Sequence, residues 1–144
     1  MMFQNILVPI DLSNQSTRAF KIALDIAKKY HSKVILLTCI EKNTSNHLYY
    51  SLITSPRLLK KRIEVAKKHF EKLESIAKKN NVSVRSKIIT SISPTNTIVT
   101  FAKSKKQDLV VIGSHGRTGF NKWLLGSVAN GISQKINCPV LIIK

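Results

Sequence analysis

The sequence is poor in acidic residues, in glycine and in long apolar runs. Of its 144 residues only 7 are Asp or Glu, against 24 Lys or Arg, which gives a net charge of +17. No stretch approaches the about eighteen consecutive apolar residues of a membrane-spanning helix, so no span is predicted. The first residues, Met1 to Asn5, lack the basic-then-apolar layout of a signal peptide. We therefore expect a protein that stays in the cytoplasm.

Cysteine is scarce and histidine is scattered. Cys39 and Cys138 lie far apart in apolar surroundings, which is typical of free buried thiols rather than of a disulfide. The two cysteines lack the close spacing of metal ligands. The histidines form no metal-like group either; they are His31, His47, His69 and His115. The sequence predicts no metal site built from protein side chains alone.

The excess of positive charge consists largely of lysine pairs in helical segments: Lys28-Lys29, Lys60-Lys61, Lys67-Lys68, Lys78-Lys79 and Lys105-Lys106. A solvated helix surface is the favoured interpretation, since lysine is rarely buried. An electrostatic footprint for a polyanion is the alternative. We expect no specific recognition of nucleic acid, while weak and salt-sensitive contact with it is compatible with this charge.

Apolar runs and helical stripes alternate along the chain. Strands are predicted at 5–10, 33–40, 82–90, 109–112 and 138–144, with helices between them. Such alternation favours a parallel sheet with right-handed crossovers. The length suits one domain over 1–144, and no repeat or linker divides it. The stretch 41–56 matches neither pattern clearly, and it is either a lid or an extension of the helix that follows.

Residues suited to helix ends support this reading. Ser13 precedes the first helical stripe as a candidate N-cap, and Ser93-Pro94 is a cap followed by proline at the first helical position. Asn80-Asn81 follows the second stripe, and asparagine tolerates the left-handed conformation that ends many helices. The element boundaries are therefore expected at these residues.

The most specific pattern is Gly113-Ser114-His115-Gly116, followed after nine residues by Gly126-Ser127. It connects a buried strand to the start of a helix through a basic loop, 117–122. A glycine-rich turn before a helix N-terminus forms an anion site, because backbone N–H groups and the helix dipole face the ligand. Glycine permits positive φ and close backbone approach. A plain loop is the alternative, and the position after a strand favours phosphate binding.

Asp11 follows the first strand, as Gly113 follows the fourth. Ligands of doubly wound sheets bind at the carboxyl ends of strands, where the strand order reverses. The first and fourth strands are natural neighbours at that point, so both residues would face one crevice. A second helix cap is the alternative role for Asp11.

The whole chain from Ile6 to Ile143 resembles the universal stress protein family of the nucleotide-binding kind. The likeness rests on Val8–Ser13, on Pro94 with Asp108–Gly113, on 138–141 and on the glycine pattern. It implies a doubly wound α/β fold, a five-stranded parallel sheet of order 3-2-1-4-5 with helices on both faces. It also implies ATP between the first and fourth strands and a homodimer through the C-terminal strand, 139–144.

The resemblance also assigns residues to the parts of a nucleotide. Those that would line the adenosine are Pro9, Ile10, Asp11 and Cys39, the last at the adenine where the family usually has valine. Those that would hold the ribose and phosphates are Ile112, Gly113, Gly116, Gly126, Ser127 and Val128. Apart from the resemblance, the loop itself offers His115 and Arg117 as cationic or donor groups for phosphates. A second departure is Ile92, where a glycine is common before the third helix; it concerns that turn.

The function expected from these features is that of an ATP-binding stress-response regulator that signals by nucleotide occupancy. The ligand is ATP, ADP or AMP, with Mg²⁺ held mainly by phosphate oxygens and water, since no carboxylate cluster exists to cage it. We assign no catalytic residue. A slow ATPase and a basic polyanion-binding protein are the alternatives.

Overall fold

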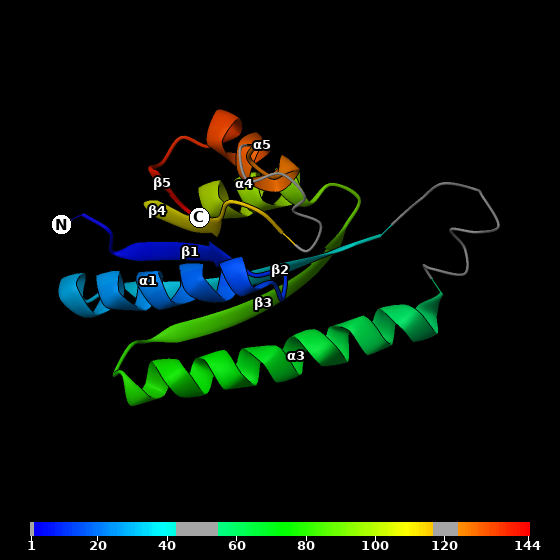
Figure 1. Ribbon diagram of the computed structural model, residues 1–144, viewed down its shortest axis with the longest axis horizontal. Helices are drawn as coiled ribbons and strands as arrows, with labels where there is room; N and C mark the ends of the chain where they lie inside the picture. The colour runs from blue at the N-terminus through cyan, green and yellow to red at the C-terminus, as the bar shows by residue number, and fades with distance from the viewer. Residues whose placement is uncertain (1, 43–54, 117–123) are drawn as a thin grey trace.

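Five parallel strands form the centre of the protein (Figure 1). The structure is a computed structural model that describes residues 2–42, 55–116 and 124–144. The strands are β1 (Asn5–Pro9), β2 (Lys33–Glu41), β3 (Val84–Ser91), β4 (Leu109–Gly113) and β5 (Val140–Ile143). They lie in the order β3-β2-β1-β4-β5, and every described pairing is parallel. The predicted sheet order is confirmed.

Helices cover both faces of this sheet (Figure 1). α1 (Asn14–Tyr30) and α3 (Pro56–Lys79) pack on one face, and α4 (Pro94–Ser104) and α5 (Ser127–Lys135) on the other. Successive β1 residues serve opposite faces, since Ile6 and Val8 join the α1–α3 core whereas Leu7 joins the α4–α5 core. All three are fully buried, and each such side chain contributes about 1.5–3 kcal/mol through burial. A strand buried on both faces needs a continuous apolar run, which is what its sequence has.

The helix ends follow the predicted caps. The hydroxyl of Ser13 accepts the N–H of Ser16 at 3.1 Å, and Ser93 caps α4 ahead of Pro94. Asn81 has a φ of 57°, so the left-handed residue predicted after α3 is present. The next residue, Val82, donates its N–H to the carbonyl of Ala77 in that cap.

The strand ends differ slightly from prediction. β3 begins at Val84 rather than Val82, because the Val82 N–H closes the α3 cap instead of joining the sheet. β1 ends at Pro9, one residue earlier than expected, and β2 runs one residue further, to Glu41. β5 begins at Val140, after Pro139, which has no N–H to donate. These shifts leave the predicted topology unchanged.

Ile92 lies in the turn before α4 at the place where the family often has glycine. Its side chain is 67% exposed, and Ile92 is not among the non-glycine residues with positive φ, which are Phe3, Leu12, His31, Asn81 and Lys106. The turn therefore needs no left-handed residue at this position. An isoleucine fits there without backbone strain.

The surface agrees with the charge pattern. All ten lysines of the five pairs are exposed, as predicted for solvated helix faces. Both cysteines are free, as expected, but they are half-buried rather than buried. No helix among the described residues is both long enough and apolar enough to cross a membrane.

Candidate functional site

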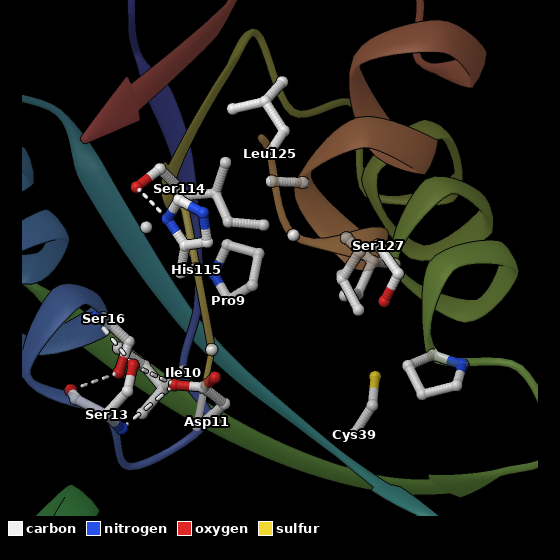
Figure 2. A pocket seen from close by; sticks show the side chains of 18 of the residues that line it. Pro9, Ile10, Asp11, Ser13, Ser16, Cys39, Ser114, His115, Leu125 and Ser127 are labelled. Carbon is white, nitrogen blue, oxygen red and sulfur yellow. Dashed lines mark hydrogen bonds between the residues drawn. The ribbon is translucent and has the colours of Figure 1, made fainter. Parts of the chain in front are cut away.

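A cavity of about 500 Å³ opens at the carboxyl ends of β1 and β4 (Figure 2). It lies at the point where the sheet order reverses, between strands whose following helices, α1 and α5, cover opposite faces. Eleven of the twelve predicted site residues line it: Pro9, Ile10, Asp11, Cys39, Ile112, Gly113, His115, Gly116, Gly126, Ser127 and Val128. Arg117 lies outside the described residues. The fold thus brings together residues from four separate parts of the chain.

Asp11 is both a turn residue and a wall of the cavity. Its Oδ1 accepts the N–H of Ser13 at 3.0 Å and also the Ser13 hydroxyl, while Leu12 between them has a φ of 70°. Its other oxygen, Oδ2, faces Gly116, since a Cβ built on Gly116 would lie 2.5 Å from it. The N-cap of α1 is Ser13 and not Asp11, so Asp11 stabilises the turn and lines the cavity.

The start of α5 differs from the other described helices. Each of α1, α3 and α4 begins with a serine whose hydroxyl accepts a backbone N–H. α5 has Gly126 in that position, with no side-chain hydrogen bond, and the next residues, Ser127 and Val128, line the cavity. Figure 2 shows Ser127 at the cavity end of the helix. The first N–H groups of a helix need acceptors, so this end is suited to an anion in the cavity.

The glycines of the site act through close approach and not through positive φ. No described glycine has positive φ, so the predicted use of that freedom is wrong at Gly113, Gly116 and Gly126. A Cβ on Gly113 would lie 2.8 Å from the Cβ of Gln15, and one on Gly126 would lie 3.1 Å from the carbonyl oxygen of Ser114. Glycine is needed because α1 and the His115 loop pack directly on the backbone.

His115 lies on the loop that follows β4. Its Nδ1 is 2.9 Å from the hydroxyl of Ser114, and its Nε2 is buried with no hydrogen-bond partner among the described residues. Ser114 is itself fixed, because its N–H donates to the carbonyl of Ile143 at 2.7 Å and its carbonyl accepts the N–H of Gly126 at 2.7 Å. The ring is therefore held by Ser114, while its second nitrogen has no partner among these residues.

Cys39, near the end of β2, also lines the cavity (Figure 2). Burial raises the pKa of its thiol to about 11. The side chain is therefore a neutral group at physiological pH, and it offers a small, polarisable surface. Such a surface suits a flat apolar ring better than it suits a charged group.

The cavity also includes residues that the sequence analysis did not assign to a binding site. Two of them carry charge: Glu41 at the end of β2 and Arg62 on α3, whose guanidinium donates to the Glu41 carbonyl at 3.3 Å. The uncharged ones are Ser13, Ser16, Leu37, Pro94, Ile98, Ser114, Leu124, Leu125 and Ala129. Nothing local in α3 marks Arg62, which reads as one more exposed cation. Only the packing of α3 against β2 brings it to this site.

The chemistry available here is that of anion and ring binding. The start of α5, with no side-chain cap, and Cys39 with apolar neighbours line the same cavity. Within the described part of the chain, no three His, Cys, Asp or Glu residues are grouped so as to hold a metal ion. Any metal here would depend on ligand oxygens.

Together these features define a doubly wound α/β protein with a cavity at its topological switch point. The sequence model described as "Universal stress protein family" matches residues 2–144. The chain belongs to the universal stress protein family.

Curated relatives extend over the same length. The chain is 33% identical to universal stress protein MJ0531 of Methanocaldococcus jannaschii over 147 residues, which covers 99% of this chain and 83% of the relative. It is 31% identical to universal stress protein YxiE of Bacillus subtilis, covering 99% and 100% of the two chains.

Solved structures share the fold. Universal stress protein UspA from Lactobacillus plantarum has a TM-score of 0.90 at 24% identity, with 100% of this chain and 99% of that chain covered. A universal stress protein from Archaeoglobus fulgidus in complex with dAMP has a TM-score of 0.71 at 23% identity, with 100% of both chains covered. Another, in complex with cAMP, has a TM-score of 0.76 at 22% identity, covering 100% and 99%. At these identities the likeness concerns the fold alone.

Proposed function

We propose that this protein binds an adenine nucleotide in the cavity between β1 and β4 and regulates a cytoplasmic stress response by its nucleotide occupancy. The observation that carries the proposal is the start of α5, which alone among the described helices lacks a side-chain cap and opens into the cavity. A cavity of about 500 Å³ falls within the usual 300–1,000 Å³ of small-molecule sites. A bound nucleotide would place its phosphates at the uncapped start of α5 and fit within the volume of the cavity.

The proposed orientation of the nucleotide follows from the chemistry of the lining residues. Phosphates suit the start of α5 at Gly126 and Ser127, where N–H groups and the helix dipole favour negative charge. The adenosine suits Cys39 and Ile10, which give apolar contact. Asp11 then faces the ribose, whose hydroxyls are donors that a carboxylate accepts.

The proposed nucleotide is ATP, and ADP and AMP are the alternatives with fewer phosphates. Two proteins of this fold are complexes with dAMP and cAMP, which supports an adenine ligand here without fixing its number of phosphates. Mg²⁺ would be held by phosphate oxygens and water, because the described residues supply no cluster of ligands for it.

The proposal includes a homodimer through the C-terminal strand. β5 is an edge of the sheet and is apolar along its length. Long apolar edges invite uncontrolled pairing unless they are covered, and pairing with a second copy about a two-fold axis covers both edges at once.

The direct experiment is mass spectrometry of nucleotide released from the purified protein, followed by calorimetry with ATP, ADP and AMP. Gly126→Val is expected to abolish binding, because its side chain would push the Ser114–Gly116 backbone away from the start of α5. Ser127→Ala is expected to cost about 1 kcal/mol through loss of one hydrogen bond. Ser133→Ala, near the other end of the same helix, is the matched control. Unchanged affinity in Gly126→Val would refute the site.

A further inference from the structure

α3 exposes an unusual row of apolar side chains. Leu58, Val65 and Ile76 are 42%, 46% and 37% exposed. Successive members are about two and three helical turns apart, so all three lie along one line of the helix. We call this line the α3 seam. It is separate from the buried stripe of α3, which consists of Ala66, Phe70, Leu73 and Ala77.

The seam runs along the edge of α3 that faces α1. The opposite edge faces β3, because Glu74 accepts a hydrogen bond from Ser86 of that strand at 2.5 Å. At the C-terminal end of α3, Lys28 of α1 donates to the side chain of Asn80 at 3.1 Å. α1 and α3 thus lie side by side on the same face of the sheet, as Figure 1 shows.

At the N-terminal end of α3 the space between the helix and the β1–α1 turn is a second cavity of about 320 Å³. Val65 of the seam lines it, opposite Leu12. Three residues line both this second cavity and the proposed nucleotide cavity: Asp11, Cys39 and Arg62. The middle of the seam therefore borders the second cavity, and this cavity shares three lining residues with the proposed nucleotide cavity.

The charges that α3 places beside the seam have one sign. Four exposed lysines lie next to it on the solvent side of α3: Lys61, Lys68, Lys72 and Lys79. Lys28 contributes a further cation from α1. The acidic residues of α3 fall elsewhere, since Glu74 faces β3 and the spacing of Glu64 and Glu71 puts them further round the helix. A partner of the seam must combine apolar side chains with negative charge.

We propose that the α3 seam and the second cavity dock an acidic amphipathic helix of a partner protein, and that nucleotide occupancy alters this docking through Arg62. An amphipathic helix presents apolar anchors at helical spacing with charges beside them, which is the complement of this surface. Nucleic acid needs cations and stacking aromatics, and an apolar strip adds nothing to its binding. The docking of the partner helix is argued from the seam alone. Only the effect of nucleotide on this docking rests on the proposed function.

The coupling has a specific route. The Arg62 guanidinium donates to the Glu41 carbonyl inside the nucleotide cavity, while its helix position places it beside Val65 in the second cavity. A bound nucleotide that engages or displaces Arg62 changes the charge offered to the partner helix. The effect is reciprocal, so the partner changes nucleotide affinity by the same factor.

The probe is a fluorescein-labelled peptide of about 18 residues, five helical turns, with leucine at every third or fourth position and glutamate elsewhere. A scrambled peptide of the same composition is its control. Fluorescence anisotropy is expected to show at least about tenfold tighter binding of the patterned peptide, a difference of about 1.4 kcal/mol. Val65→Glu with Ile76→Glu is expected to remove this preference.

The role of the lysines beside the seam is tested with two double variants of α3. Lys68→Glu with Lys72→Glu changes the side next to the seam, and Lys60→Glu with Lys67→Glu changes the side away from it. Both alter the net charge of +17 equally, so only a docking surface distinguishes them. The first pair is expected to lose about tenfold in peptide affinity and the second much less. Equal losses, or equal binding of patterned and scrambled peptides, would overturn the proposal.

Two further measurements test the alternative of nucleic-acid binding and the proposed effect of nucleotide. Single-stranded DNA of similar charge is expected to compete weakly; stronger binding of DNA than of the peptide would assign the surface to nucleic acid instead. Titration of the peptide with and without ATP tests the coupling, and Arg62→Ala is expected to abolish any difference between the two. ATP affinity measured alone on the same protein shows whether a missing difference reflects failed nucleotide binding or failed coupling.

Discussion

Gly116 and Asp11 approach so closely that a Cβ on Gly116 would lie 2.5 Å from the Oδ2 of Asp11. The carboxylate has little freedom to retreat, because Ser13 holds its Oδ1 through both its N–H and its hydroxyl. This contact joins the end of β1 to the loop after β4, two segments that are a hundred residues apart in sequence. It fixes one wall of the cavity.

Gly116→Ala is therefore expected to weaken nucleotide binding at least about tenfold, since the methyl group must displace either the loop or the carboxylate. Calorimetry with ATP measures this loss. Gly131→Ala is the control, because its Cβ would crowd Thr95 of α4 at 2.7 Å, outside the cavity. The control is expected to lower the melting temperature and leave affinity unchanged. Equal affinities in Gly116→Ala and the wild-type protein would contradict the assigned role of the Gly116–Asp11 contact.

The fold was predictable because its signals are local. Apolar strand runs, capping residues such as Ser13 and Ser93, and the Asn80-Asn81 stop each depend on near neighbours in sequence. The glycine pattern likewise marks the α5 start, since only backbone and helix dipole are needed there. The reason for those glycines was not predictable: whether a glycine serves positive φ or close packing depends on what lies opposite, such as Gln15 against Gly113.

Arg62, which lines the cavity, shows more clearly what the sequence alone does not predict. Arg62 is one of many exposed cations in sequence, and its contact with Glu41 exists only because α3 packs across β2. Val82 is similar, since its alternation with Val84 suggested a strand residue while its N–H closes the α3 cap. In both cases a tertiary contact outweighs a local pattern, and a single sequence does not record such contacts.

The hydrogen-bonding pattern of β5 allows the proposed dimer to be tested by removing a single backbone N–H group. The carbonyls of Pro139 and Ile143 accept N–H groups of β4 and the loop that follows it, so the alternate residues Val140 and Ile142 direct their backbone groups outward. Ile142→Pro removes an outward donor and is expected to give monomers in analytical ultracentrifugation. Ile142→Ala, which loses side-chain packing but keeps the N–H, is expected to remain dimeric. A wild-type protein that sediments as a monomer at micromolar concentration would contradict the proposal.

Cys39 predicts a dependence of stability on alkaline pH. Burial raises its pKa from the ordinary 9.0 to about 11, so the folded state keeps a proton that the unfolded chain releases. Stability from this group is complete below pH 9 and is lost as the pH rises through 11. Cys39→Ala is expected to show a shallower fall in the free energy of unfolding between these values in denaturant titrations of nucleotide-free protein. Parallel curves for the two proteins would show that the thiol does not contribute.

The geometry of the site predicts that any ATP hydrolysis is slow. Hydrolysis needs the γ-phosphate charge neutralised and a water held in line with it. The α5 N-terminus and His115 serve the first requirement. The acids lining the described cavity are Asp11, which is tied to Ser13, and Glu41, which lies at the end of β2 near Cys39. In the proposed orientation both face the adenosine, so neither is behind the γ-phosphate.

His115 is the remaining candidate base, but its Nδ1 is held by Ser114, and its Nε2 is buried. Binding without a preorganised line of attack stabilises the ground state and does little to lower the barrier. Turnover is therefore expected far below the 1–10³ s⁻¹ of typical enzymes, so that occupancy rather than flux carries the signal. Steady-state phosphate release from ATP with Mg²⁺, on protein first freed of nucleotide, measures this rate. Sustained release near about one per second, lost in Asp11→Ala or His115→Ala, would make the protein an ATPase and exclude the occupancy switch.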